Sequence, residues 1–211
     1  MTKKKAVKKI TAKKITTKKI AVKKIAVKKV ATKKILFVCT GNTCRSPMAQ
    51  VMAAHLFGPG YEIISAGLMA MPNSAASAHA VAVMKERQLN LTGHKAQPVT
   101  EILVKESDLI LAMTPSHKTA ISKLTVANVW TLTEYANADE NAVDGDTGRN
   151  KDGGESGIEV PGNRIFDAEP PVSGVSDPFG GDIEVYRKCA GEIYCLLEKV
   201  LARICREDNF E

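Results

Sequence analysis

The stretch that most constrains the fold is an apolar run that ends in a short polar loop and leads into a helical pattern. Residues 35–39 read Ile-Leu-Phe-Val-Cys, and β-branched and aromatic side chains of this kind are typical of a buried strand. The loop contains Gly41, and Ser46 and Pro47 then favour the N-cap and the first position of a helix. This helix is expected to continue over residues 48–57. The stretch therefore predicts a strand, a loop and a helix in direct succession.

Short apolar runs and amphipathic segments alternate through most of the remaining chain. Further strands are expected over 61–66, 109–113 and 127–132, and further helices over 75–89, 100–108 and 115–124. The last helix is marked by apolar residues at steps of four and three, which are Tyr186, Ala190, Ile193, Leu197, Val200 and Ile204. The alternation predicts an α/β fold with a four-stranded parallel sheet, helices on both faces and right-handed crossovers.

The positive charge is concentrated at the N-terminus. Residues 1–34 hold 15 of the 30 Lys and Arg residues, and no acidic residue precedes Glu62, so this segment carries +15 and the remainder −8. The segment repeats every five residues, and five steps of a helix turn through about 140°, so its apolar residues form no stripe. We expect a disordered tail over residues 1–34 and one domain over residues 35–211.

Two interpretations of the tail remain open. It can bind nucleic acid or another polyanion, with an affinity that falls as salt rises, or it can be a low-complexity expansion that the domain tolerates. No aromatic residue lies between the lysines, which argues against stacking on single strands.

An acidic insert is expected at about residues 136–176, where nine acidic and three basic residues accompany many Gly, Pro, Asn and Ser residues. Part of it resembles a calcium-binding loop through Asp144, Asp146, Asn150, Asp152 and Glu155. However, Arg149 stands where that loop needs glycine, and no helix is expected on either side. A solvated acidic loop is the better interpretation, and attraction between this loop and the tail is an alternative.

The cysteines and the lack of long apolar runs predict a cytoplasmic protein. The five cysteines are odd in number and unevenly spaced, which is a poor disulfide framework, and they are Cys39, Cys44, Cys189, Cys195 and Cys205. No secretory signal fits the N-terminus, and no run reaches the roughly 18 apolar residues of a membrane span.

Spacing excludes several kinds of site in the loop after the first strand. Cys39 and Cys44 have four residues between them, no second ligand pair follows at suitable spacing, and the histidines are scattered, so zinc is not expected. A thioredoxin-like site needs two intervening residues. The loop also lacks the glycine and lysine pattern of nucleotide-binding motifs.

An anion cradle agrees with each position of this loop. Backbone N–H groups that converge at a helix N-terminus bind phosphate, and Gly41 allows a close approach of the backbone to the ligand. Arg45 supplies a planar charged fork for two phosphate oxygens. Cys39 would lie beneath the phosphorus, where the donors and the positive charge favour its thiolate. The arrangement predicts a cysteine nucleophile for phosphoryl transfer.

Asp177 is the candidate acid for the leaving group. It opens the sequence Asp-Pro-Phe-Gly-Gly, just before the last helix, and the proline fixes the backbone that follows it. Alone, this motif would suggest an exposed turn. Together with the cysteine loop, it suggests general acid catalysis.

Five motifs in this order resemble the low-molecular-weight protein tyrosine phosphatase family, and within it the bacterial protein arginine phosphatases most closely. They are ILFVCTGNTCRSPMA at 35–49, SAG at 65–67, DLILAMT at 108–114, TLTEY at 131–135 and DPFGG at 177–181. The resemblance covers residues 35–211 apart from the insert. It implies a four-stranded parallel sheet, no metal or other cofactor, and a phosphocysteine intermediate.

The resemblance also implies residue roles. Cys39 would be the nucleophile, Arg45 would hold the phosphoryl group, and Asp177 would protonate the leaving group and later deprotonate water. Substrate-binding positions would be Thr40, Gly41, Asn42, Thr43, Cys44, Ser46 and Phe179.

Four residues would support the nucleophile. Asn42 would brace the loop with Ser65 as its partner, and Ser46 would hydrogen-bond the sulfur of Cys39. Cys44 would form a reversible disulfide with Cys39 under oxidation. Packing within the loop is the alternative role for Cys44.

Thr43 is the main guide to the substrate. The family's tyrosine phosphatases usually carry a bulkier aliphatic residue there, whereas threonine is associated with phosphoarginine. The shorter, polar side chain suits a branched phosphoguanidinium, while Phe179 can stack on either substrate. The predicted function is a phosphoarginine protein phosphatase, and a tyrosine phosphatase is the alternative.

Two other functions agree less well with these residues than a phosphatase does. An arsenate reductase would relay a disulfide to further cysteines, but Cys189 and Cys195 fall on opposing sides of the last helix. A non-enzymatic polyanion-binding protein would act through the tail, with the domain as a remnant. The intact set of Cys39, Arg45 and Asp177 favours the enzyme.

Overall fold

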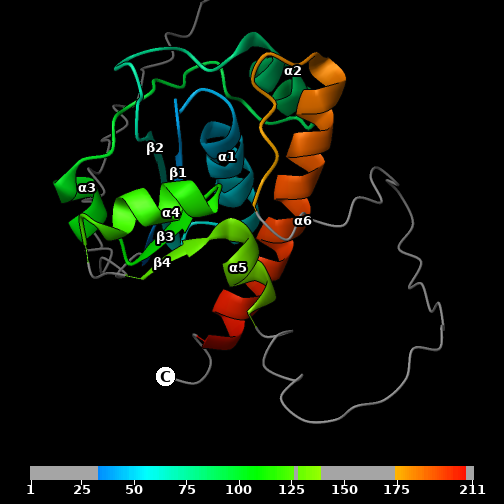
Figure 1. Cartoon of the computed structure of the whole chain (residues 1–211). Helices are drawn as coiled ribbons and strands as arrows, with labels where there is room; N and C mark the ends of the chain where they lie inside the picture. The colour runs from blue at the N-terminus through cyan, green and yellow to red at the C-terminus, as the bar shows by residue number, and fades with distance from the viewer. Residues whose placement is uncertain (1–32, 126–127, 139–173, 208–211) are drawn as a thin grey trace, which may run out of the picture. The chain divides into compact units, whose positions relative to one another are not determined.

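The computed structural model describes residues 33–125, 128–138 and 174–207. Its centre is a four-stranded parallel sheet in the order β2-β1-β3-β4 (Figure 1). The strands are β1 (Lys33–Cys39), β2 (Tyr61–Gly67), β3 (Leu109–Ala112) and β4 (Val129–Thr131). The predicted parallel sheet is confirmed. The prediction of a disordered tail, up to residue 32, lies outside the described residues. The predictions for residues 139–173 of the acidic insert, which include the resemblance to a calcium-binding loop, also lie outside them.

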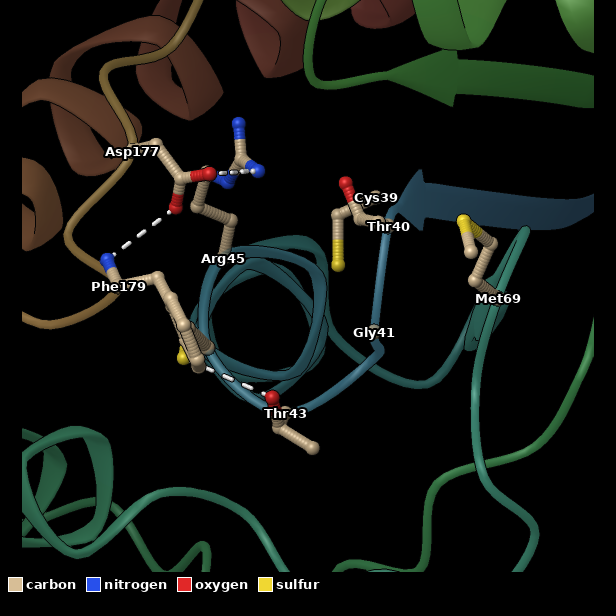
Figure 2. A pocket seen from close by; sticks show the side chains of 9 residues that line it. Cys39, Thr40, Gly41, Thr43, Arg45, Met69, Asp177 and Phe179 are labelled. Carbon is tan, nitrogen blue, oxygen red and sulfur yellow. Dashed lines mark hydrogen bonds and ion pairs between the residues drawn. The ribbon is translucent and has the colours of Figure 1, made fainter.

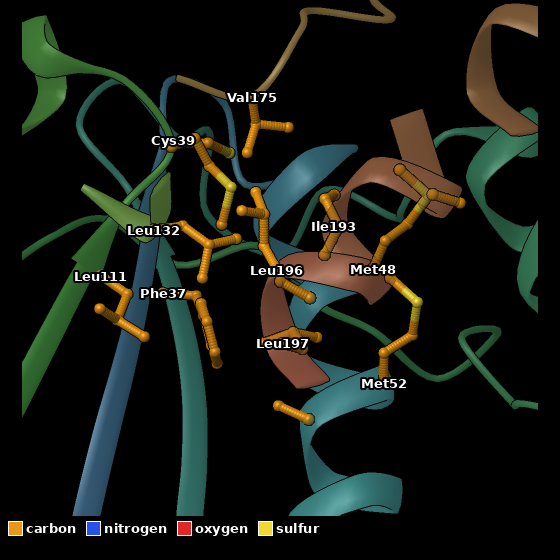
Figure 3. Close-up of a cluster of buried hydrophobic side chains, with 14 of the residues drawn as sticks. Phe37, Cys39, Met48, Met52, Leu111, Leu132, Val175, Ile193, Leu196 and Leu197 are labelled. Atoms are coloured by element: carbon orange, nitrogen blue, oxygen red, sulfur yellow. The ribbon is translucent and has the colours of Figure 1, made fainter. Parts of the chain in front are cut away.

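Helices cover both faces of this sheet. They are α1 (Arg45–Phe57), α2 (Ala78–Glu86), α3 (Glu101–Lys105), α4 (Pro115–Ser122), α5 (Leu132–Asn137) and α6 (Ile183–Glu207). Successive side chains of β1 point to opposite faces, so Phe37 packs with α1 and α6 while Leu36 packs with residues of α3 and α4. Figure 3 shows part of the larger core, between the sheet and helices α1 and α6.

The apolar stripe predicted for the last helix lies in this larger core. Its six residues are all buried, and α6 packs against α1, α2 and α5. A helix of 25 residues with one apolar face therefore spans most of this side of the domain (Figure 1).

The start of α1 differs from the prediction. The helix begins at Arg45 with Cys44 at its N-cap and no side-chain cap, so the prediction of Ser46 as the N-cap was wrong. The Ser46 hydroxyl instead accepts a hydrogen bond from Asn42 and lies 3.0 Å from the sulfur of Cys39. A serine next to a polar loop has partners there that compete with helix capping.

Several other boundaries moved. The helices predicted over 75–89, 100–108 and 115–124 are shorter, and residues 136 and 137, which were expected in the insert, belong to α5. The predicted strand over 127–132 is shorter because Thr131 caps α5, where it forms a capping box with Glu134. At the N-terminus, Lys33 and Lys34 belong to β1, and Lys34 forms ion pairs with Glu62 and Glu106. The last two residues assigned to the tail therefore belong to the domain.

The segment that returns from the insert is joined to the end of β3. Val175 donates its N–H to the carbonyl of Met113 at 2.8 Å. Gly174 has φ +127°, and a Cβ there would lie 2.8 Å from the same carbonyl oxygen, so a side chain is excluded. Residues 174–176, which were expected to belong to the insert, therefore place Asp177 beside the carboxyl ends of the central strands, where α/β folds bind ligands.

Candidate active site

The sulfur of Cys39 lies at the base of the loop between β1 and α1. It accepts the backbone N–H of Asn42 at 3.3 Å and lies 3.0 Å from the hydroxyl of Ser46. The cysteine is only 3% exposed. The sulfur therefore lies between the backbone of the loop and the first turn of α1, where an anion would be favoured.

Asn42 joins the loop to its surroundings. It is fully buried and has a positive φ of 54°, a conformation that asparagine adopts more readily than most residues. Its side-chain N–H groups donate to Ser46 and Ser65, both at 2.9 Å, and its Oδ1 accepts the N–H of Gln97 at 3.0 Å. Gly41 was expected to provide the conformational freedom of this turn, but the residue with the positive φ is Asn42.

Two further contacts support this region, and neither was predicted from the sequence. His94 donates its Nε2–H to the Asn42 carbonyl at 2.8 Å, and Gln50 accepts a hydrogen bond from Ser65 at 2.6 Å. Both residues lie in segments without a distinctive motif, so only the folded chain brings them to the loop.

Arg45 and Asp177 meet above the loop, as Figure 2 shows. Nη2 of Arg45 lies 2.8 Å from Oδ2 of Asp177, and its Nη1 donates to the carbonyl of Val175 at 3.5 Å. The arginine side chain is 6% exposed and the aspartate side chain 54%. Oδ1 of Asp177 accepts the N–H of Phe179 at 3.2 Å, a local turn that aims the carboxyl group back toward the loop.

Most of the predicted catalytic and substrate-binding residues line one pocket of about 340 Å³, but Asn42 and Ser46 are fully buried and do not line it. Its walls are formed by Cys39, Thr40, Gly41, Thr43, Cys44, Arg45, Met69, Asp177 and Phe179. Figure 2 shows Phe179 and Met69 on opposite sides of the loop, and both side chains are 80% exposed. Met69 was not predicted, because a lone methionine two residues after β2 carries no recognisable pattern.

His117 also contacts the loop, although no sequence motif indicated it. Its Nε2 lies 2.9 Å from the hydroxyl of Thr40, and its Nδ1 lies 2.7 Å from that of Thr114. Burial, and then the positive charge of Arg45, lower the pKa of His117, while Asp177 opposes the shift. The ring is therefore neutral at physiological pH and supports the loop from the α4 side.

Cys44 has hydrogen-bond partners other than those of Cys39. Its sulfur lies 3.2 Å from the hydroxyl of Tyr186 and 3.5 Å from that of Ser77. Burial is the main cause that raises the pKa of Tyr186 to about 12. Cys39 and Cys44 are both free thiols. These contacts suit the packing role, and the reversible disulfide remains a prediction.

Neither a metal site nor a membrane span appears within the described ranges. No group of three or more His, Cys, Asp or Glu residues is placed to hold a metal ion there. None of the described helices is long and apolar enough to cross a membrane.

Comparisons with known proteins identify the family. A family model described as low molecular weight phosphotyrosine protein phosphatase matches residues 34–154. The chain is 36% identical to a protein-arginine-phosphatase of Bacillus subtilis over 181 residues, which cover 83% of this chain and 98% of the relative. It is also 33% identical to PtpB of Staphylococcus aureus, a low molecular weight protein-tyrosine-phosphatase, over 81% of this chain and 99% of the relative.

Solved structures show the same fold. The YwlE arginine phosphatase from Geobacillus stearothermophilus matches with a TM-score of 0.63 and 31% identity, over 85% of this chain and 97% of that chain. The sheet, the cysteine loop and the relatives agree. The chain belongs to the low molecular weight phosphotyrosine protein phosphatase family and is a cysteine-based protein phosphatase.

Proposed function

We propose that this phosphatase hydrolyses phosphoarginine in proteins through a phosphocysteine intermediate. The observation that carries the choice of substrate is the half-buried Thr43 in the pocket wall, beside the loop that holds Cys39 and Arg45. Similarity to two protein-arginine-phosphatases over more than four fifths of the chain supports it.

The first step transfers the phosphoryl group to sulfur. The thiolate of Cys39 attacks phosphorus, the S–P bond forms, and the P–N bond breaks. The electron pair of that bond goes to the leaving nitrogen, which takes a proton from the carboxyl group of Asp177. Arg45 turns part of its fork from Asp177 to the phosphoryl oxygens, where charge gathers in the transition state.

The second step regenerates the enzyme. Asp177, now a carboxylate, takes a proton from water, whose oxygen attacks phosphorus while the P–S bond breaks. The electron pair returns to Cys39, and the hydroxyl of Ser46 at 3.0 Å stabilises the thiolate that leaves. A solved arginine phosphatase, 34% identical to this chain, is described as a cysteine-to-serine mutant with a phosphorylated active-site serine, which supports a covalent intermediate.

The size and polarity of Thr43 account for the substrate preference. A phosphoguanidinium is branched next to phosphorus and rich in N–H donors, whereas a phenol is slim and apolar. Threonine leaves more room than isoleucine and offers a hydroxyl, which can accept an N–H of the guanidinium. Isoleucine at this position would narrow the pocket and leave that donor without a partner.

The test compares kcat/KM on matched phosphoarginine and phosphotyrosine peptides. We expect the wild type to prefer phosphoarginine, and Thr43→Ile to shift the ratio toward phosphotyrosine by about tenfold or more. Thr92→Ile, at an exposed threonine outside the pocket, is the matched control. A wild type that prefers phosphotyrosine, with a ratio that Thr43→Ile leaves unchanged, would overturn the arginine assignment.

For the N-terminal tail we propose contact with a polyanion, which includes nucleic acid as one possibility. The support is compositional, since residues 1–32 hold 13 lysines and no acidic residue.

A further inference from the structure

A buried carboxylate stands behind the loop that carries Asp177. Glu192 lies on α6, faces the interior and is only 5% exposed. Burying a carboxylate is costly unless it accepts good hydrogen bonds, so its partners indicate what it is there to hold. The two-step reaction described above makes no use of this group.

Among the described residues, the hydrogen bonds to the Glu192 carboxylate all come from one residue, Ser176. Its backbone N–H lies 3.3 Å from both carboxylate oxygens, and its hydroxyl donates to Oε2 at 2.5 Å. Ser176 immediately precedes Asp177 in the chain. The buried charge of α6 therefore fixes the peptide unit that leads into the proposed general acid.

A second side chain of α6 holds the same residue. Cys189, three positions before Glu192 on the helix, lies 3.5 Å from the carbonyl of Ser176 and donates to it. Burial, and then the charge of Glu192, raise the pKa of Cys189, so it remains a thiol and a donor. Both polar ends of Ser176 are thus held by the same turn of α6.

The preceding residue is held from the opposite side. Val175 donates to Met113 at the end of β3 and accepts a hydrogen bond from Arg45. Residues 175–177 therefore run between Arg45, which binds the phosphoryl group, and Glu192, which has no access to the pocket. With both sides fixed, the distance between the proton donor and the phosphoryl site is set by the fold.

We propose that Glu192 is a positioning residue for the general acid: through Ser176 it holds the Asp177 carboxyl at the position from which it protonates the leaving group. This rests on the proposed role of Asp177 and not on the choice between phosphoarginine and phosphotyrosine. A residue that only stabilises the fold would affect all substrates alike. A positioning residue affects those substrates whose leaving group needs a proton.

The experiment compares kcat/KM for phenyl phosphate, whose leaving group needs a proton, with that for dinitrophenyl phosphate, whose leaving group departs as an anion. For Asp177→Asn we expect a loss of about 10²-fold on phenyl phosphate. Glu192→Gln should lose about tenfold and Ser176→Ala about threefold on the same substrate, because misplaced groups lose part of their effect. On dinitrophenyl phosphate, the kcat/KM of each of these three variants should stay within about twofold of the wild-type value. Glu198→Gln, at an exposed position of the same helix, should match wild type on both substrates.

The variants separate the two levels of the hypothesis. If Asp177→Asn loses both substrates equally, the proposed acid is wrong and the positioning role falls with it. If Asp177→Asn is selective while Glu192→Gln loses both substrates equally or neither, only the positioning role is overturned. Should Glu192→Gln fail to fold, Ser176→Ala decides alone: a loss confined to phenyl phosphate supports the role, and any other pattern overturns it.

Discussion

At the scale of single residues, the chemistry depends on how the sulfur of Cys39 is surrounded. The chain supplies a backbone N–H from Asn42 and a hydroxyl from Ser46, both within seven residues of the cysteine. In the proposed reaction the sulfur is both the nucleophile and the leaving group, and these two groups lie within hydrogen-bonding distance of it in either role. A hydroxyl in place of the thiol serves neither role well, because its proton is lost far less readily.

We therefore predict that Cys39→Ser lowers kcat/KM by about 10⁴-fold or more on either phosphopeptide. Any phosphoryl group that reaches the serine should remain there, since an alkoxide is a poor leaving group. Intact-mass spectrometry after incubation with substrate would then find a mass gain of one phosphoryl group. Cys205→Ser, at an exposed cysteine of α6, is the control and should retain activity. Turnover within tenfold of wild type would exclude Cys39 as the nucleophile.

His117 makes stability depend on pH. Its pKa is lowered in the folded state, chiefly by burial, whereas the unfolded chain titrates near 6.5. Its contribution to stability is therefore complete above about pH 6.5 and is lost as the pH falls from there through the lower folded-state value, because the unfolded state then binds more protons.

We expect the unfolding free energy of wild type, minus that of His117→Gln, to fall as the pH is lowered from 7.5 to 5. Urea unfolding at a series of pH values measures this difference. His55→Gln, on the solvent-exposed side of α1, is the matched control. A difference that stays constant or rises over this range would show that burial does not lower the pKa of His117.

At the scale of secondary-structure elements, the end of β2 packs against the loop between β1 and α1. Gly67 pairs with Cys39 across the sheet. A Cβ at Gly67 would lie 2.6 Å from the carbonyl oxygen of Thr40 and 2.8 Å from the backbone nitrogen of Asn42. Both atoms belong to the backbone of the loop, so a side chain could fit only if the loop moved.

We predict that Gly67→Ala displaces the loop, lowers kcat/KM by at least about tenfold and destabilises the fold by about 1–3 kcal/mol. Gly60→Ala, just before the same strand, introduces a methyl group with no atom within 4 Å and should change neither quantity. Kinetics and thermal unfolding of both variants test this. Wild-type kinetics in Gly67→Ala would mean that the loop tolerates the displacement.

The elements that the sequence predicted best are those whose signals are local. The βα unit around Cys39 could be read directly, since the strand, loop and helix are consecutive. His117, Met69 and Glu192 could not, because only the folded chain brings His117 and Met69 to the loop and Glu192 to Ser176. The N-cap at Ser46 failed for a related reason: its hydroxyl is used by partners in the folded loop that the helix signal cannot reveal.

At the scale of the whole molecule, charge separates the chain into two parts. Residues 1–32 hold 13 lysines and no acidic residue, whereas residues 33–211 hold 17 basic and 23 acidic residues. The residues proposed for catalysis all lie in the second part. Lys34 is also needed there, because it pairs with Glu62 and Glu106 near the N-terminal end of the inner strand β1.

A truncation that removes residues 1–32 but keeps Lys33 and Lys34 therefore separates catalysis from polyanion binding. We expect kcat/KM on a small aryl phosphate to stay within about twofold of the full chain, because every pocket residue is retained. Binding to duplex DNA or heparin should be lost, and in the full chain it should weaken steeply with salt. A full-length variant with the tail lysines changed to glutamine distinguishes charge from length. If truncation abolished turnover, the tail would be part of the catalytic unit. If the full chain bound DNA but hydrolysed no phosphorylated substrate, the polyanion-binding alternative would replace the enzyme.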